Sequence, residues 1–254
     1  MKNTKNLSLK ILAGVLAAAL IGGILFVTNA LVGNPISTSF ADKAIKQYVE
    51  INYSFLDLEI EKATYNFKDS SYFAWAKSKT SIDTKFVISY RGGEVLSDGY
   101  ESNVLSMFNT LQRLSDEYSS VMKALVSKEL GFENNTTMVM YNKDEYESAA
   151  DIIELDMKFD KALPIDAEVT LRLDLINNSI ESVAKVLTDA HKVFVDSGYA
   201  FSKYSLYAET DGMLIMINNV TPVDIKSGEL ANLLEKAKAG ENANGISVFI
   251  KGEK

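Results

Sequence analysis

The sequence predicts an α+β protein in which an N-terminal transmembrane helix precedes two small domains, each with helices packed on a mainly antiparallel sheet. An uncharged apolar run at residues 11–32 has the length of a membrane-spanning helix. Segments that alternate apolar and polar residues, as half-buried strands do, occur in both halves of the chain. Amphipathic helical segments stand before or between these strands, which is the element order of α+β domains.

Residues 11–32 form the predicted membrane span. The run covers about 33 Å at about 1.5 Å per residue, which matches a hydrocarbon core of about 30 Å. Three lysines within residues 1–10 predict that this tail is cytoplasmic and that the rest of a single-pass cell-membrane protein lies outside. The alternative is a cleaved signal peptide with Thr28-Asn29-Ala30 as a poor cleavage site. The apolar run, however, exceeds the roughly 7–15 residues typical of such peptides.

Residues 33–100 are predicted to form the first domain, a helix plus a three-stranded meander. Ala41, Ile45 and Val49 recur at helical spacing soon after the span. Three strand-like segments follow: LDLEIEKATYNFKD, whose apolar face changes near Lys62, then SYFAWAKS and DTKFVISY. Arg91-Gly92-Gly93 ends the third segment.

Residues 101–131 are predicted to form a connecting helix between the domains. Apolar residues recur at intervals of three and four from Val104 through Tyr118 to Leu125, and Gly131 supplies the C-terminal stop. A helix of this length is expected to be about 40 Å long.

Residues 132–254 are predicted to form the second α+β domain. TTMVMYN reads as a strand, an acidic segment follows it, and AEVTLRLDL alternates strictly as a half-buried strand. Ser179 is expected to cap a helix that ends at Gly198. Asp211-Gly212 then predicts a β-hairpin, before a helix in GELANLLEKAKAG and a last strand in GISVFI.

The composition excludes several chemistries. The chain has no cysteine, which removes disulfides, thiolate nucleophiles, Cys-ligated zinc and iron–sulfur clusters. Its one histidine, His191, lies at the edge of an apolar helix stripe and is interpreted as structural, with pH sensing as the alternative. Glycine-rich phosphate loops of either common pattern are absent from the sequence.

Carboxylates are plentiful but give no specific pattern. Asp151, Glu154, Asp156 and Asp160 could cluster, yet the spacing of a calcium-binding loop is not met. We therefore assign no catalytic, cofactor-binding or metal residue and expect no cofactor. Beyond the three lysines of the tail, 23 basic residues face 34 acidic ones, so the exported part should repel nucleic acid and anionic lipid heads.

Tyrosines are the most distinctive residue type. The chain has twelve, and several fall within the predicted strands and their margins. Exposed rings could form a glycan- or peptide-binding face, because they offer a large contact area at low entropic cost. Their spacing follows the strand period, which favours the alternative that they fill the core and the sheet margins.

Several short motifs resemble the YfjL-like proteins of low-GC Gram-positive bacteria. These are NPIS directly after the membrane segment, the helix with Ala41, Ala44 and Tyr48, and the segments YNFKD and SIDTKF. AEVTLRLDL and the helix after it are similar to the C-terminal domain of that family. The resemblance implies a membrane-anchored, two-domain extracytoplasmic protein of unknown role, and it supplies no catalytic residues.

The sequence therefore favours a non-enzymatic binding or interaction module at the cell envelope. Its partners would be the membrane, through the N-terminal helix, and a protein, peptide or cell-wall ligand. One alternative is a hydrolase of envelope glycans that works through a carboxylate pair, one of whose pKa values burial would raise. The other is an inhibitory or regulatory module that presents a sheet edge or an uncovered sheet face.

Overall fold

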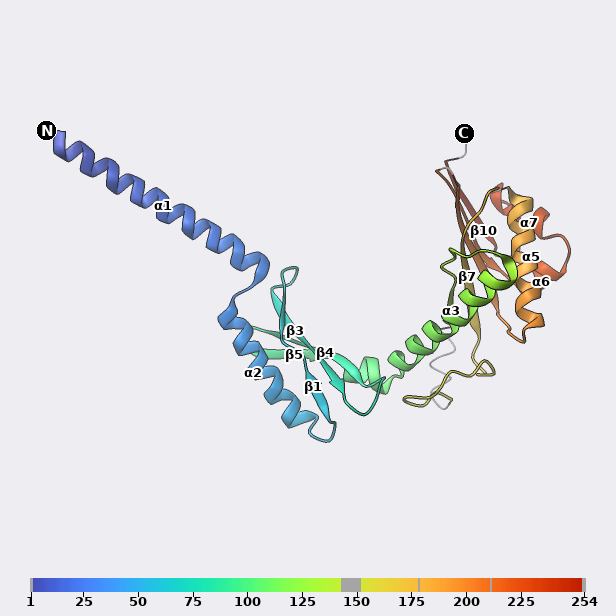
Figure 1. Cartoon of the computed structure of the whole chain (residues 1–254), viewed down its shortest axis with the longest axis horizontal. Helices are drawn as coiled ribbons and strands as arrows, with labels where there is room; N and C mark the ends of the chain where they lie inside the picture. Colours follow the sequence, from blue (N-terminus) through green and yellow to red (C-terminus); the bar gives the residue numbers. More distant parts are fainter. Residues whose placement is uncertain (1, 143–151, 178, 211, 253–254) are drawn as a thin grey trace. The chain divides into compact units, whose positions relative to one another are not determined.

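The computed structural model describes residues 2–142, 152–177, 179–210 and 212–252 and shows an α+β chain. Contacts divide the chain into two compact units, Met1–Ser106 and Met107–Lys254. Each unit holds one five-stranded sheet with helices (Figure 1). The predicted fold class is confirmed, with the refinement that the sheet of the second unit is mixed rather than wholly antiparallel.

Helix α1 spans Lys2–Val32. Its apolar window has a mean hydropathy of 2.5 and none of it is buried within the protein. The large apolar side chains of this helix are exposed along its whole described length. By length and composition α1 fits a single membrane span, and it equally fits a signal sequence.

The first unit continues with α2, Pro35–Asn52, and an antiparallel sheet. Its strands are β1 Leu58–Ile60, β2 Thr64–Asn66, β3 Ser71–Ser78, β4 Lys85–Arg91 and β5 Glu94–Asp98. Both β1 and β2 pair with β3, so the predicted first strand is split where its apolar face changes. The prediction of three strands missed β5. This strand follows a tight turn in which Gly92 and Gly93 both have positive φ, and it is too short to show a clear period.

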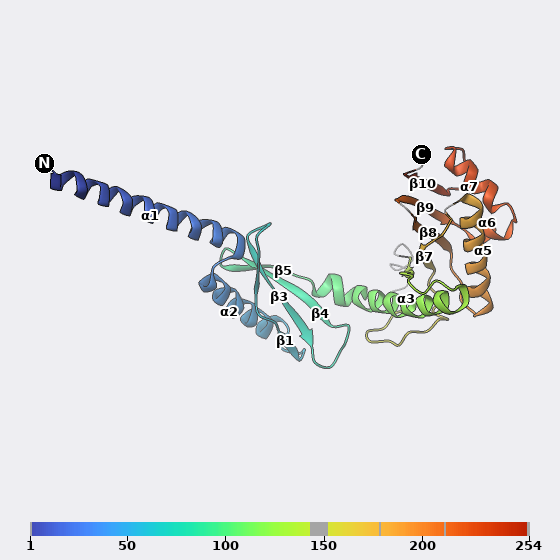
Figure 2. The ribbon, with the colours of Figure 1, turned by 45° about the horizontal axis from the view of Figure 1, so that its top comes forward.

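Helix α2 covers one face of the first sheet. It buries Ala41, Ile45 and Val49, and it packs on β3 and β4 (Figure 2). The strands contribute Ala74 and Ala76 with larger neighbours to the same core. Alanines on both partners allow the helix to lie close to the sheet.

The predicted continuous helix over residues 101–131 is wrong at its start. A π-helical turn at Tyr100–Leu105 ends before Met107, which adopts a left-handed conformation with φ +58°, and α3 runs only from Phe108 to Leu130. The left-handed residue interrupts the helical hydrogen-bond ladder, which an apolar period alone does not reveal. Helix α3 packs on β6, Met138–Tyr141, within the second unit.

The second sheet has the order β10-β9-β8-β7-β6. Its further elements are β7 Ala167–Asp174, α5 Ile180–Asp196, β8 Lys203–Thr210, β9 Met213–Val220, α6 Pro222–Lys226, α7 Leu230–Lys238 and β10 Ser247–Lys251. Strands β7 and β8 are parallel and α5 connects them, whereas the other pairs are antiparallel. The predicted pairing of the hairpin strands, the helix capped by Ser179 and the last strand are confirmed, while Asp211 of the hairpin turn lies outside the described residues. Residues 143–151 of the acidic segment lie outside the described residues.

The core of the second unit lies between the sheet and its helices. Alternate residues of β7, from Ala167 to Leu173, are buried. They meet the apolar stripe of α5, which includes Leu187 and Phe194. Helices α5, α6 and α7 lie on the same side of the sheet in both ribbon views (Figures 1 and 2).

Candidate functional site

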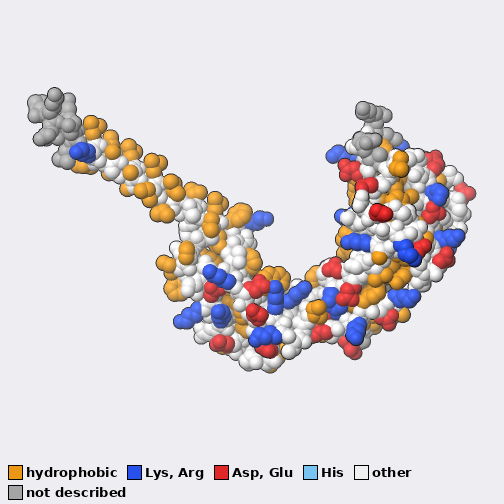
Figure 3. Space-filling model, in the orientation of Figure 1, with side chains coloured by type: hydrophobic (Ala, Val, Ile, Leu, Met, Phe, Trp, Pro, Cys, Tyr) orange, Lys and Arg blue, Asp and Glu red, His pale blue; other side chains and the backbone are white. Residues whose placement is uncertain are grey.

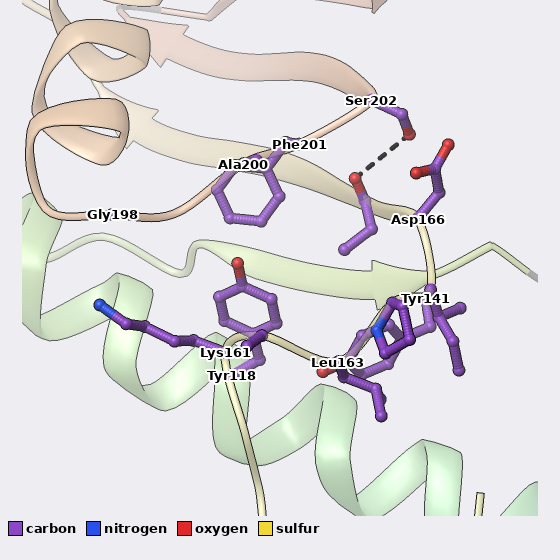
Figure 4. A pocket seen from close by; sticks show the side chains of 13 residues that line it. Tyr118, Tyr141, Lys161, Leu163, Asp166, Gly198, Ala200, Phe201 and Ser202 are labelled. Atoms are coloured by element: carbon purple, nitrogen blue, oxygen red, sulfur yellow. Dashed lines mark hydrogen bonds between the residues drawn. The ribbon is translucent and has the colours of Figure 1, made fainter. Parts of the chain in front are cut away.

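A pocket of about 450 Å³ opens in the second unit where the chain enters the parallel strands β7 and β8. The segments 161–167 and 198–202 form two of its walls, and Tyr118 of α3 and Tyr141 of β6 complete it (Figure 4). A volume of this size suits a small ligand, because ligand pockets commonly measure about 300–1,000 Å³.

Two tyrosine rings define the inner part of the pocket. Tyr118 and Tyr141 have ring centroids 6.0 Å apart, and both are buried. The Tyr141 hydroxyl has no hydrogen-bond partner among the described residues. Burial, with the nearby carboxylates of Asp160 and Glu117, raises the pKa of Tyr141 to about 12. Burial likewise raises the pKa of Tyr118, so both phenols stay protonated at neutral pH and remain hydrogen-bond donors.

A lysine lies at the margin of the pocket. Lys161 Nζ donates to the carbonyl oxygen of Ser197 at 3.4 Å and stands 5.2 Å from the centroid of the Tyr199 ring. The carbonyl belongs to the C-terminal end of α5, where the helix dipole favours a cation. Gly198 has φ +79°, and a Cβ there would lie 2.9 Å from Lys161 Nζ. A glycine at this position therefore leaves room for the ammonium group.

His191 lies outside this pocket, in the core of the second unit. Its Nδ1 is 2.8 Å from the Tyr204 hydroxyl, and only 8% of its surface is exposed. Burial, with the positive charge of Lys226, lowers the pKa of His191. The described pocket lining offers no histidine beside a serine, and hence no nucleophile and base of the hydrolase type. The described pocket lining instead supplies hydrogen-bond donors, among them the Tyr141 hydroxyl and the Lys161 ammonium group.

The described acidic residues do not form a catalytic or metal centre. No group of three or more His, Asp or Glu in the described ranges could hold a metal ion, and Asp151 lies outside those ranges. Asp224 is buried, but its carboxylate accepts hydrogen bonds from Thr221 and Asn244. These hydrogen bonds lower its pKa against the opposing effect of burial, whereas a general acid requires a raised pKa.

A second surface lies on the sheet face opposite α5. Arg172, Tyr207, Met216 and Phe249 are direct neighbours across β7, β8, β9 and β10. The Arg172 guanidinium stands 5.4 Å from the centroid of the Tyr207 ring. Phe249 is 54% exposed. This row combines a cation with aromatic and thioether groups, a composition common at protein interfaces.

Sequence reasoning did not single out the pocket residues. It treats the tyrosines as a group and favours a core role for such rings. Tyr118 was placed only as one position of a helix stripe. The sequence signal that could have pointed to the pocket is the pair of segments that precede β7 and β8, because parallel neighbours bring their starts together.

Comparison with known proteins identifies the family. Residues 8–99 match the family model described as "YfjL-like, N-terminal domain", and residues 117–235 match "YfjL-like C-terminal domain". A protein of Bacillus subtilis (strain 168), described as "Uncharacterized protein YfjL", is 24% identical over 196 residues, which cover 76% of this chain and 82% of that protein. No solved structure matches the chain. Because both domain models match in order along the sequence, the chain belongs to the YfjL-like family.

Proposed function

We propose that the chain is a single-pass membrane protein whose two units lie outside the cell and act as a non-enzymatic binding module. Helix α1 has the length and apolar composition of a span. The three lysines in its first residues, before the apolar run 11–32, support a cytoplasmic N-terminus. Carbonate extraction of membranes would leave such a protein in the pellet, and external protease would digest both units in intact protoplasts. Release into the soluble fraction would contradict the anchor.

The observation that carries the binding role is the buried, unpartnered hydroxyl of Tyr141, a residue that lines a pocket of ligand size. Buried polar groups in folded proteins are nearly always hydrogen-bonded, so this donor is suited to an acceptor supplied from outside the fold. Lys161 adds a second donor at the margin. The ligand we propose is a peptide or cell-wall fragment that places a carbonyl or carboxylate oxygen in the pocket.

Photo-crosslinking at the pocket margin tests this role. Ala162 is exposed and lines the pocket, so a photoreactive phenylalanine analogue at this position should capture the bound partner in living cells. Ala239 is a matched control, because it is an exposed alanine that follows α7. A product at position 162 that Tyr141→Phe diminishes supports the proposal. Equal products at both positions, or none at either, contradict it.

The partly exposed row of Arg172, Tyr207, Met216 and Phe249 on the second sheet favours an inhibitory or regulatory role as the second candidate. Arg172, Tyr207 and Phe249 would dock against a partner protein, since aromatic and arginine side chains often supply most of the binding energy of an interface. Phe249→Ser would then abolish capture of a partner without altering the crosslink at position 162. The carboxylate hydrolase has less support, because the described acids whose pKa values are shifted, Asp69 and Asp224, have lowered ones.

A further inference from the structure

The junction between α1 and the first unit is short and held by side chains of the sheet. Only Gly33 and Asn34 separate α1 from α2. The backbone N–H of Asn34 donates to the Tyr72 hydroxyl at 3.1 Å, and its side chain caps α2 by accepting from Ile36 N at 2.8 Å. Asn34 is thus bound through its backbone to the sheet and through its side chain to the helix that follows.

This junction requires glycine at position 33. Its φ is +78°, and a Cβ there would lie 2.6 Å from Cγ of Tyr65. Tyr65 packs against Tyr72 with ring centroids 5.1 Å apart. Any other residue would meet both an unfavourable backbone conformation and a clash with the Tyr65 ring. The connection is therefore a packed contact, unlike the loose polar linker that would let a domain move away from its anchor.

Three large apolar side chains are exposed around this junction. Ile36 is 67% exposed, Phe40 is 62% exposed and Phe67 is 57% exposed. Ile36 and Phe40 are one turn apart on the face of α2 opposite the buried Ala41 and Ile45. Figure 3 shows hydrophobic side chains continuing from α1 onto the adjoining part of the first unit.

Chain continuity places these side chains near the end of the span. Ile36 follows Val32 by four residues, and one further helical turn, about 5.4 Å, separates it from Phe40. The headgroup region on each side of a bilayer is about 5–7.5 Å deep, given a total thickness of about 40–45 Å around a core of about 30 Å. Phe67 is two residues beyond Tyr65, the residue that contacts Gly33.

We propose that Ile36, Phe40 and Phe67 insert into the headgroup region of the outer leaflet, so that the first unit rests on the lipid surface. The proposal rests on the proposed anchoring of α1. Since the part of the chain after α1 is acidic, the contact is apolar rather than electrostatic. It should therefore persist in zwitterionic lipid and at high salt.

Tryptophan fluorescence in vesicles tests the contact, because Trp75 is the only tryptophan. In the full chain carrying Trp75→Phe, single tryptophans replace Leu20 in α1, Phe40 or Phe67 at the junction, or Ile51. Ile51 is 70% exposed near the other end of α2. Each variant is reconstituted in phosphatidylcholine vesicles that carry bromine on the acyl chain either near the headgroup or near the bilayer centre. Circular dichroism of each variant verifies that the helices are retained.

The expected quenching pattern distinguishes the proposed anchoring of α1 from the proposed contact of the first unit with the lipid surface. Leu20→Trp should be quenched most by deep bromine. Phe40→Trp should emit at shorter wavelength and be quenched most by shallow bromine, while Ile51→Trp should be quenched by neither. Phe67→Trp should repeat the Phe40 result. Unquenched Leu20→Trp would overturn the anchor, whereas quenched Leu20→Trp with Phe40→Trp behaving like Ile51→Trp would overturn only the surface contact.

Discussion

Strand β6 ends the second sheet, and Ser119 of α3 bonds to its outer edge. Ser119 Oγ accepts a hydrogen bond from Val139 N at 2.8 Å and donates to Ser115 O at 2.7 Å. The Ser115 hydroxyl lies at 3.5 Å from Tyr141 N, the next amide on the same edge. A helix that satisfies an edge strand in this way blocks pairing with another chain.

Replacing Ser119 by alanine should destabilise the second unit. The buried Val139 amide would lose its partner, which costs about 1–3 kcal/mol. Alanine gains at most about 0.7 kcal/mol in helix propensity, so the net loss is about 0.3–3 kcal/mol. For a unit of about 150 residues this lowers the melting temperature by about 1–12 °C.

Amide hydrogen exchange in the full chain in detergent micelles measures the protection of the Val139 amide. Thermal unfolding followed by circular dichroism measures the loss of stability. Ser119→Ala should accelerate exchange at Val139. Ser120→Ala is the matched control, because Ser120 is exposed and its hydroxyl donates to the Asp116 carbonyl of the same helix. If the two variants melt alike and protect the Val139 amide equally, the edge-capping argument fails.

Four further predictions follow from single residues. Because burial raises the pKa of Tyr141 to about 12, the stability that the neutral phenol contributes should be fully present below about pH 10, the ordinary tyrosine value, and fall as the pH approaches 12. Melting temperatures measured across this pH range should fall less steeply in Tyr141→Phe, and the same slope in both proteins would contradict this contribution. Leu206→Ala, at a fully buried position of β8, should lower the free energy of unfolding by about 2–5 kcal/mol in denaturant titration. A smaller loss than that of an exposed-site control would refute the placement of Leu206 in the core. The hydrogen bonds to Asp224 lower its pKa, so the stability that this carboxylate contributes should be present above about pH 3.9, the ordinary carboxyl value, and be lost in more acidic solution. Asp224→Asn should remove that part of the acid sensitivity, and an acid unfolding profile identical to that of the unmodified protein would contradict this contribution. Gly33→Ala should cost about 1–3 kcal/mol through backbone strain and the Tyr65 contact, seen as earlier unfolding by Trp75 fluorescence, and unaltered unfolding would show that the junction is not tightly packed.

Local signals predicted most elements of both units. The Ser179 cap of α5 and the antiparallel pairing of β8 with β9 each depend on neighbouring residues alone, and the structure has both as expected. Strand β3 matches the predicted SYFAWAKS segment residue for residue. Such elements are predictable because the residues that cap, turn or alternate lie within the element itself.

Other features depend on residues far apart in the sequence. The hydrogen bonds between Ser119 and Val139 cross 20 positions, so the sequence showed only a long amphipathic helix and not its role beside the sheet edge. The left-handed conformation of Met107 could not be predicted either, because glycine or asparagine normally signals such a conformation and this position holds a methionine. The pocket was not predicted for the same reason, because its walls come from four separate segments.

Edge capping and the candidate pocket share the same two elements, since α3 supplies Ser119 and Tyr118 while β6 supplies Val139 and Tyr141. Tyr118 immediately precedes Ser119 in α3, and Tyr141 lies two residues after Val139 in β6. A shift of α3 along or away from β6 would therefore change the separation of the two hydroxyl donors as it breaks the capping bonds. The covering helix thus has two effects, protection of an exposed edge and placement of the donors that we propose bind the ligand. Ser119→Ala, which is outside the proposed ligand contacts, should weaken the photo-crosslink at position 162 if this coupling holds, whereas Ser120→Ala should leave it unchanged.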